Sequence, residues 1–311
     1  MPNAENLPFI PVASVLKRGS LPQDVLGEWT ERSNPVVLRE DPKRTIVKLA
    51  THENHTVVFK QEYRPGNFVH ERKALLALSS NWHGTSGMAP FPLVTDVDIF
   101  HREFLMERVP GKNVQERLVD NTTPLRMSEK VHIADGLLQA VDYAHSLSIA
   151  HLDIKPENIM YDQQTGRIAL VDWGSSGHGE TIHQCHIINV KPEIAPSGST
   201  MPNVPNIIIQ PPEIMRQTTI DGELADRYQV ASALVQLFWG IDYLIYAAES
   251  GPPRINIGKL RAMIKNALGY DTRQDTILDL VTTNLSASVY GRRTTEEDLK
   301  LGLKELDSQI K

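Results

Sequence analysis

Residues 151–176 read HLDIKPENIMYDQQTGRIALVDWGSS, and this stretch carries the most specific signal in the chain. The turn-forming letters QQTG separate two short apolar runs, which predicts a β-hairpin. Four polar side chains lie before or after its strands: Asp153, Lys155, Asn158 and Asp172. Either aspartate alone is typical of an ordinary turn at a strand end, so the specificity lies in the whole combination.

The string closely resembles the catalytic loop and metal-binding segment of eukaryotic-type protein kinases, which combine H-R-D-x-x-x-x-N with D-F-G. The resemblance implies that Asp153 is the catalytic base for the attacking hydroxyl and that Lys155 neutralises the transferred phosphoryl group. It also implies that Asn158 and Asp172 hold Mg²⁺ with ATP, because this hard cation prefers oxygen ligands. The form D-x-K-P-E-N is similar to Ser/Thr rather than Tyr kinases.

A lysine and a glutamate upstream are implied to complete the ATP site. Lys60 ends the strand-like run TVVFK, where the family anchors ATP with a lysine. Glu71 is its implied partner, because a helix places it on one face with Leu75 and Leu78. The spacing of 11 residues is shorter than the family usually has, which leaves the length of the helix open. The alternative is an ordinary lysine on a sheet edge and an ordinary helical glutamate.

The segment FLMERVPGKN, residues 104–113, resembles the hinge that binds the adenine edge through backbone hydrogen bonds. The resemblance makes Met106 the gatekeeper and places Glu107 and Arg108 beside the nucleotide. A plain strand that leads into a turn is the alternative for this segment.

Three downstream features resemble protein kinases and are missing from the aminoglycoside-kinase type. QPPEIM, residues 210–215, is similar to the A-P-E segment, and Asp226 is similar to the aspartate that braces the catalytic loop. Arg293 resembles the arginine that pairs with the glutamate of A-P-E, which predicts a Glu213–Arg293 ion pair. The resemblance covers about residues 35–306.

These patterns predict an α+β, protein-kinase-like two-lobed fold, with a small antiparallel β-sheet lobe and a mainly helical lobe. We expect an N-terminal extension at 1–34 and a kinase-like domain at 35–308, with lobes at 35–110 and 111–308 and ATP between them. The expected strands are 36–38, 45–49, 56–59 and 99–106. The expected helices are 70–78, 128–147 with Ser128 as N-cap, 226–239, 259–268, 275–282 and 295–306 with Thr294 opening a capping box.

Composition excludes several classes of protein. The chain has 311 residues, 41% hydrophobic and 23% charged, which is typical of a globular protein. Its net charge of −6 and its scattered basic pairs give no footprint for nucleic acid, so we expect no nucleic-acid partner. One cysteine, Cys185, rules out an intrachain disulfide framework and suits a reducing compartment. No signal peptide or membrane span is apparent, so we expect a protein of the cytoplasm, or one delivered to a host cytosol.

Two departures from the family bear on activity. Residues 38–45, LREDPKRT, stand where the glycine-rich loop belongs, and they contain no glycine. This favours a catalytically inactive kinase-like protein, although Lys43 and Arg44 could meet phosphates with their side chains. Leu152 replaces the arginine of H-R-D, so activation through a phosphorylated residue clamped there is not expected. Trp173 replaces the phenylalanine of D-F-G, which is a conservative aromatic change.

The segment after Asp172 holds the metal-ligating types His178, His183, Cys185 and His186. Their spacing matches no standard closed zinc site, and a polar loop is the simpler interpretation.

The sequence therefore predicts a Ser/Thr protein kinase that uses ATP and Mg²⁺ to phosphorylate a protein substrate. A kinase-shaped scaffold that binds protein partners without turnover remains the first alternative. A kinase-fold enzyme that acts on a small molecule, or that transfers a nucleotide, is the second.

Overall fold

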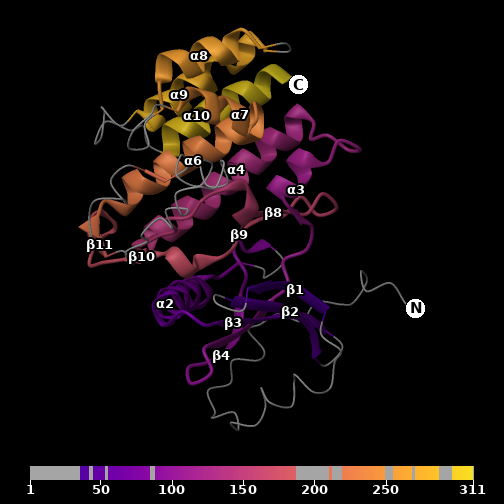
Figure 1. The fold of residues 1–311 in the computed structure, drawn as a ribbon, viewed down its shortest axis with the longest axis vertical. Helices are drawn as coiled ribbons and strands as arrows, with labels where there is room; N and C mark the ends of the chain where they lie inside the picture. Colours follow the sequence, from indigo (N-terminus) through magenta and orange to yellow (C-terminus); the bar gives the residue numbers. More distant parts are fainter. Residues whose placement is uncertain are drawn as a thin grey trace, which may run out of the picture. The chain divides into compact units, whose positions relative to one another are not determined.

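The computed structural model describes residues 36–41, 45–52, 55–84, 88–186, 210–211, 219–248, 255–267, 270–286 and 296–310. The chain forms two compact units, Met1–Pro110 and Gly111–Lys311. Figure 1 shows that strands and one long helix make up the described part of the first unit, whereas helices dominate the second. The expected α+β architecture is confirmed.

The first unit is built on a five-stranded antiparallel sheet with the order β1-β2-β3-β5-β4. Its strands are β1 (Val36–Asp41), β2 (Thr45–His52), β3 (His55–Glu62), β4 (Val94–Asp98) and β5 (Glu103–Glu107). β3 lies in the centre, where Lys60 is opposite Val47 on one side and Phe104 on the other. The β-branched runs of the sequence thus form the antiparallel sheet that they predicted.

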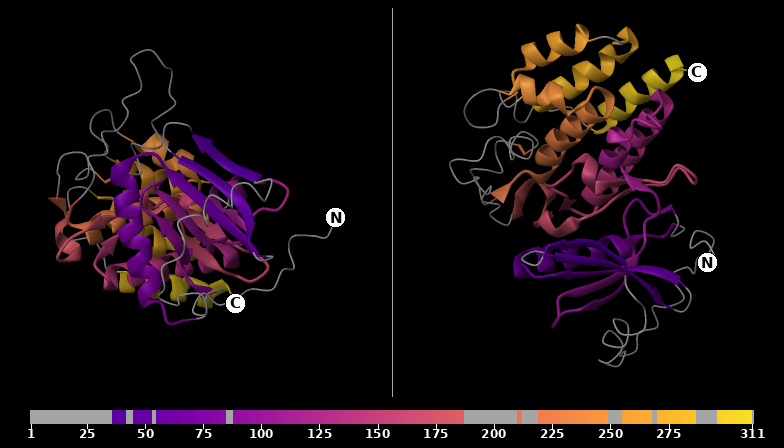
Figure 2. Two further views of the ribbon diagram at one scale, coloured as in Figure 1. Left: turned by 90° about the horizontal axis from the view of Figure 1, so that it is seen from below. Right: turned by 45° about the vertical axis from the view of Figure 1, so that its right-hand side comes forward.

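Helix α2 (Pro65–Asn81) packs against this sheet and follows β3 after only two residues. Proline suits the first helical position because it has no N–H that needs a partner there. The helix buries Phe68, Leu75 and Leu78 along one face, and the rings of Phe68 and Phe104 lie 4.9 Å apart. Figure 2 shows α2 beside the strands. The short connection explains why Lys60 and Glu71 are only 11 residues apart although the helix is long.

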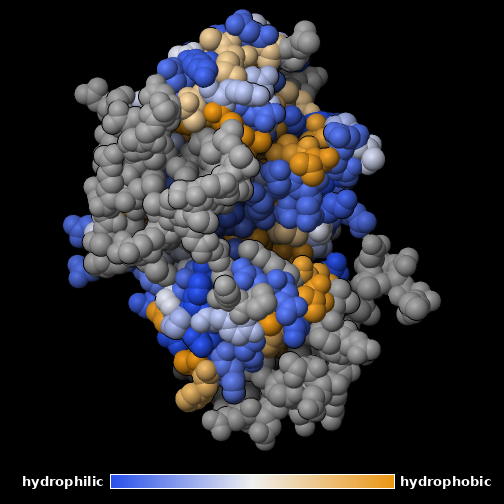
Figure 3. Space-filling model, viewed as in Figure 1, coloured by the Kyte–Doolittle hydropathy of each residue, from blue (hydrophilic) through white to orange (hydrophobic). Residues whose placement is uncertain are grey.

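The prediction of one strand at 99–106 is wrong. The segment is part of a hairpin in which β4 ends at Asp98 and β5 begins at Glu103. The Asp98 carboxylate accepts the N–H groups of Phe100 and His101, and an aspartate that bonds its own following backbone favours a turn. Ile99 and Phe100, the apolar pair that suggested a strand, are exposed at the turn. Figure 3 shows apolar side chains gathered over this turn.

The second unit is built around two helices, α4 (Met127–Ser146) and α6 (Gly222–Phe238). Almost every residue of α6 is buried, and its buried residues include polar side chains such as Asp226 and Gln229. The remaining helices are α3 (Val114–Val119), α7 (Ile241–Ala247), α8 (Ile257–Lys265), α9 (Asp275–Leu285) and α10 (Glu296–Ile310). Figure 1 shows α7 to α10 gathered at one end of the unit.

Helix boundaries differ from the sequence predictions in places. α4 begins at Met127 after Arg126, so Ser128 lies inside the first turn and is not the N-cap. The carboxylate of Glu129 accepts the backbone N–H of Arg126 instead. The short helix α3 was not predicted, because its six residues carry too little periodicity. Thr294 lies outside the described residues.

Two small sheets hold the loops of the second unit. One contains β6 (Lys112–Asn113), β8 (Ile159–Tyr161) and β9 (Ile168–Leu170), and β8 and β9 form the hairpin predicted around QQTG. The other has the order β12-β11-β10-β7, from β12 (Thr219–Ile220), β11 (Cys185–His186), β10 (Gly177–His178) and β7 (Ile149–Ala150).

Gly111 is required where the chain approaches β8. Its φ is +93°, and a Cβ atom there would lie 2.1 Å from the carbonyl oxygen of Tyr161. We expect Gly111→Ala to lower the free energy of unfolding by about 2 kcal/mol or more, because it adds left-handed strain to a backbone clash. Urea unfolding measures the change. Gly258→Ala is the control, since its Cβ would meet only Asn256 Oδ1 at 3.6 Å; an equal loss in both variants would contradict the argument.

Among the described residues, no single helix is long and apolar enough to cross a membrane. Helices α6 and α7 pass the same test only as a pair, and they are bent by 119° at their junction.

Candidate active site

The loop after β7 is held by the imidazole of His151. Nε2 of this buried ring lies 3.1 Å from the carbonyl oxygen of Val171, and Nδ1 lies 3.2 Å from the backbone N–H of Asp153. A carbonyl can only accept, so Nε2 carries the proton and Nδ1 accepts from Asp153. Burial lowers the pKa of His151, which keeps this neutral form. Its contribution to stability is therefore complete above its usual pKa of 6.5 and is lost as the pH falls through the lowered folded value.

The carboxylate of Asp153 is held from one side. Its Oδ2 accepts from Lys155 Nζ at 2.8 Å and from Asn158 Nδ2 at 3.0 Å. Asn158 Nδ2 also donates to the backbone oxygen of Asp153, at 2.8 Å. On the other oxygen, Oδ1, Asp153 accepts from Gln210 Nε2 at 3.5 Å. The three polar residues predicted for this loop are therefore brought together. Lys155 and Asn158 both donate to Oδ2 of Asp153, and neither donates to Oδ1.

Asp226 of α6 fixes the backbone of the loop through hydrogen bonds, as the sequence predicted. Its two carboxylate oxygens accept the backbone N–H groups of His151 and Leu152, both at 2.8 Å. Nε2 of His145 lies 2.9 Å from the same carboxylate, which is 1% exposed. A buried carboxylate needs such donors to offset its loss of hydration. The side chain of His145 was not singled out in the sequence, and no local pattern marks it.

Asp172 follows the β8–β9 hairpin directly. The backbone N–H of Val171 donates to the backbone oxygen of Asn158 at 2.9 Å, which brings the segments of Asn158 and Asp172 together. Asp172 has a φ of +64° and Leu152 a φ of +63°, so both lie in the left-handed region. Residues other than glycine in this region often occur at functional sites. Trp173 is fully buried; its N–H donates to Leu170, and its ring contacts His151 edge-on at 4.5 Å.

In the first unit, Lys60 and Glu71 form the ion pair that the sequence predicted. Lys60 Nζ lies 2.7 Å from Glu71 Oε1, and the side chains are 8% and 2% exposed. The pair joins the central strand β3 to α2. Removal of either partner would leave a buried charge, which is costly.

The residues predicted as a hinge lie at the end of β5. Met106 is buried between β3 and β4, where it is opposite Val58 and Val94. Glu107 ends the strand, and its backbone N–H donates to the oxygen of Leu93 at 2.8 Å. Arg108 is exposed. Their contact with a nucleotide remains a prediction.

Comparison with known proteins identifies the family. A family model for the protein kinase domain matches residues 95–300, about two thirds of the chain. The chain belongs to the protein kinase domain family. The match begins in β4, so strands β1 to β3 and helix α2 precede the matched residues.

Several kinases are similar to parts of this chain. Serine/threonine-protein kinase KSP1 of Saccharomyces cerevisiae is 33% identical over 78 residues, which are 25% of this chain and 8% of the relative. Serine/threonine-protein kinase mos of Patiria pectinifera is 34% identical over 73 residues, 24% of this chain and 21% of the relative. Casein kinase II subunit alpha' of S. cerevisiae is 30% identical over 102 residues, 33% of this chain and 29% of the relative. The matched residues thus cover less than a third of the length of each of these three relatives.

Leu152 differs from the arginine of the family pattern and is packed in an apolar cluster. It is 4% exposed and lies with Ala150, Cys185, Ile220 and Ala225. A Cβ atom at Gly177 would come within 2.8 Å of Leu152 Cδ1, so the packing is tight. The side chains of this cluster join the segment of Leu152 to β11, β12 and α6 through apolar contacts.

Among the histidines and the cysteine after Asp172, His178 and His186 lie opposite each other in β10 and β11, and His178, His183 and Cys185 have different hydrogen-bond partners. His178 Nε2 lies 3.0 Å from the hydroxyl of Ser176, and His183 Nδ1 lies 3.0 Å from Asp221. Cys185 is buried, and its thiol donates to the oxygen of Ile182. The zinc interpretation gains no support from these contacts.

Cys185 is expected to resist alkylation in the native kinase domain. Burial, followed by the nearby Asp226 and Asp221, raises its pKa to about 12 from an ordinary 9.0. The thiolate is the reactive form, so iodoacetamide at pH 8 should modify the native protein about 10³-fold more slowly than the urea-unfolded protein. The raised pKa also means that the thiol stabilises the fold below pH 9 and loses this effect as the pH rises towards 12. Equal labelling rates by mass spectrometry would contradict this.

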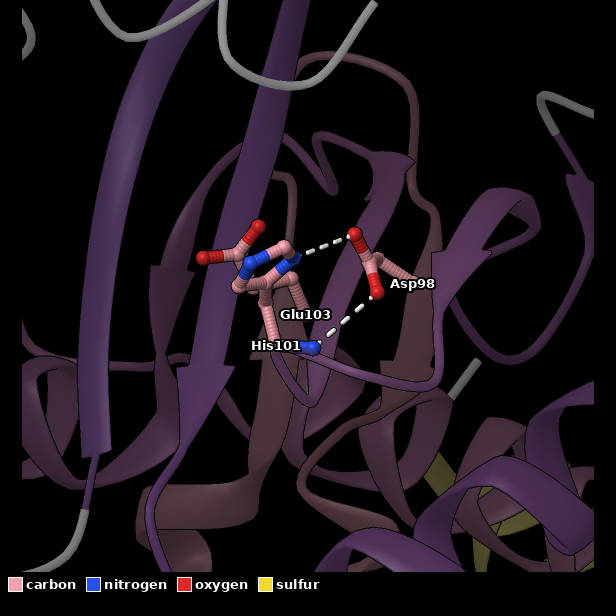
Figure 4. Close-up of side chains that lie close together, drawn as sticks. All are labelled: Asp98, His101 and Glu103. Atoms are coloured by element: carbon pink, nitrogen blue, oxygen red, sulfur yellow. Dashed lines mark hydrogen bonds and ion pairs between the residues drawn. The ribbon is translucent and has the colours of Figure 1, made fainter. Parts of the chain in front are cut away.

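One group of three metal-ligating types occurs among the described residues, in the β4–β5 hairpin: Asp98, His101 and Glu103. Figure 4 shows His101 directed at Asp98, with Nδ1 2.7 Å from the carboxylate. The hydrogen bond to Asp98 raises the pKa of the exposed His101. The group is explained by the turn it stabilises, and it includes none of the residues predicted to hold Mg²⁺.

Several predicted features lie outside the described residues: Lys43 and Arg44 of the glycine-free turn, and both partners of the Glu213–Arg293 pair. β1 and β2 on either side of that turn are described, and Asp41 lies opposite Thr45. The described residues on either side of that turn therefore pair as antiparallel strands.

Proposed function

We propose that the chain is an active Ser/Thr protein kinase, which transfers the γ-phosphate of ATP to a hydroxyl of a protein substrate with Mg²⁺. The observation that carries this proposal is the Asp153 carboxylate, held on Oδ2 by Lys155 and Asn158 and supported below by Asp226. A scaffold has no need of an oriented catalytic carboxylate whose support extends into a buried helix.

Asp153 would act on the acceptor hydroxyl with Oδ1. The hydroxyl oxygen forms a bond to the γ-phosphorus, the bond from that phosphorus to the β–γ bridging oxygen breaks, and ADP leaves. The hydroxyl proton passes to Asp153 Oδ1. Lys155 lies beside Oδ2 and carries the positive charge that stabilises the oxygens of the transferred group.

The residues present fit a magnesium ion. Asn158 uses its amide nitrogen for Asp153, so its side-chain oxygen faces away from that carboxylate, and Asp172 adds a carboxylate from the neighbouring segment. An amide oxygen and a carboxylate are ligands that Mg²⁺ prefers. The ion would neutralise charge on the phosphates. Lys60, oriented by Glu71, would bind the phosphates of ATP, and Met106, Glu107 and Arg108 would adjoin the adenine.

Specificity for serine and threonine rests on two supports. Lys155 stands in the form D-x-K-P-E-N, and the similar proteins include serine/threonine-protein kinases. Those similarities cover a minor part of this chain, so the whole activity and its substrate belong to the proposal.

A non-enzymatic kinase-like scaffold is the second candidate, and one observation favours it. Residues 38–45 contain no glycine, and side chains there keep the backbone farther from a phosphate than glycine would.

The two candidates separate in one assay. Purified protein is incubated with γ-phosphate-labelled ATP, Mg²⁺ and a generic protein substrate, beside Asp172→Ala. We expect label on serine or threonine that disappears in the variant. Nucleotide binding without label, across a panel of protein substrates, would support the scaffold, and label on a small molecule would overturn the protein acceptor.

A further inference from the structure

Gln229 is a fully buried amide in the apolar helix α6, and three hydrogen bonds account for it. Its Oε1 accepts the backbone N–H of Ile154 at 2.9 Å. Its Nε2 donates to the backbone oxygen of Leu152 at 2.9 Å and to Gln210 Oε1 at 3.0 Å. A buried amide is destabilising unless its polar atoms are bonded, and here both N–H groups and the oxygen are used.

The orientation of this amide follows from its backbone partners. The Ile154 N–H can only donate and the Leu152 carbonyl can only accept, so the oxygen and nitrogen of Gln229 cannot exchange places. The second N–H of Gln229 therefore points at Gln210 and requires an acceptor there. This fixes the oxygen of the Gln210 amide on the side of Gln229.

Gln210 in turn presents its amide nitrogen to the catalytic carboxylate. Because its oxygen faces Gln229, its Nε2 faces Asp153 Oδ1, at 3.5 Å. This is a long hydrogen bond, and such bonds at active sites often shorten when the substrate is bound. Oδ1 is the oxygen that Lys155 and Asn158 do not engage.

We propose that Gln229 and Gln210 form an amide relay that sets the orientation of Asp153 and ties the segment of Gln210 to the catalytic loop. Gln229 fixes the loop backbone on both sides of Asp153, and Gln210 is a positioning residue for Oδ1. The role in transfer rests on the proposed kinase function. The orientation of the carboxylate does not, and it can be measured in a protein without turnover.

Gln210→Met is the main variant, since it removes the amide from a half-buried site and leaves Gln229 its two backbone bonds. In protein with ¹³C-labelled aspartate, the carboxyl signal of Asp153, assigned with Asp153→Asn, is expected to shift. In the transfer assay, kcat should fall about tenfold while KM for ATP stays within about twofold. Gln236→Met is the control, because Gln236 is a buried glutamine of the same helix whose side-chain amide donates to Ser232 within α6 and not to the loop of Asp153. It should change neither readout.

Gln210→Glu separates positioning from packing. A glutamate keeps the acceptor for Gln229 and the size of the side chain, so a structural role predicts that it is better tolerated than methionine. The relay predicts the reverse for kcat, because the donor facing Asp153 becomes a second carboxylate. Thermal midpoints of both variants, measured in parallel, show whether either has lost its fold.

The outcomes distinguish the two proposals. If the wild-type protein transfers no phosphate but the Asp153 signal moves in Gln210→Met and not in Gln236→Met, the kinase proposal fails and the relay stands. If the signal is unchanged in Gln210→Met, or if Gln210→Glu turns over faster than Gln210→Met, the relay is overturned.

Discussion

Asp153→Ala is expected to lower phosphate transfer by about 10²- to 10⁴-fold, the range of a general base, with little change in nucleotide affinity. The carboxylate is the group proposed to take the proton of the acceptor hydroxyl, and Lys155 and Asn158 hold it through Oδ2. Alanine removes this acceptor and leaves the two donors without it. Single-turnover transfer and binding of a fluorescent ATP analogue measure the two effects separately.

Two further variants make this result specific. Lys60→Ala should weaken both nucleotide binding and transfer, because Lys60 is proposed to bind phosphate. Asp162→Ala is the matched control: Asp162 is a buried aspartate of the β8–β9 turn, where it accepts from Gln164 and Thr165. Its loss should cost stability and leave turnover per folded molecule unchanged. Turnover in Asp153→Ala equal to that of Asp162→Ala would end the proposed mechanism.

Asp226→Ala is expected to lower the free energy of unfolding by roughly 3 to 5 kcal/mol, as measured by urea denaturation. The substitution leaves the buried N–H groups of His151 and Leu152 without their acceptor and removes the partner of His145. Buried donors without a partner carry the full cost of their lost hydration.

Asp221→Ala, at the N-terminus of the same helix, is the comparison. Asp221 caps α6 by accepting the N–H of Leu224, and it is more exposed than Asp226. Loss of such a cap costs about 1 kcal/mol. A loss from Asp226→Ala no larger than this would show that the carboxylate does not brace the loop.

The family resemblance picked out the residues of the loop, and their mutual contacts are easy to expect because the residues are close in sequence. Asp153, Lys155 and Asn158 lie within six residues, so a single turn of the chain brings their side chains together. The Lys60–Glu71 pair was predicted through the family resemblance, and the structure contains it as a buried ion pair between a strand and the helix that follows.

Long-range partners were harder to predict. Gln229 lies 75 residues from Ile154, and in the sequence it is only a polar letter within an apolar helix. A glutamine at a buried helical position is the sequence signal that could have revealed this contact, because a buried amide requires hydrogen-bond partners. The error at 99–106 has another cause. Ile99 and Phe100 resemble strand residues, but the backbone N–H groups of Phe100 and His101 donate to the Asp98 carboxylate, and these hydrogen bonds stabilise a turn.

The contact between Trp173 and His151 gives the molecule an optical reporter. An indole in van der Waals contact with imidazole loses emission when that imidazole becomes charged, and this imidazole also holds the N–H of Asp153. With the other three tryptophans replaced by phenylalanine, the fluorescence of Trp173 would report the protonation of His151 in real time, without any added dye.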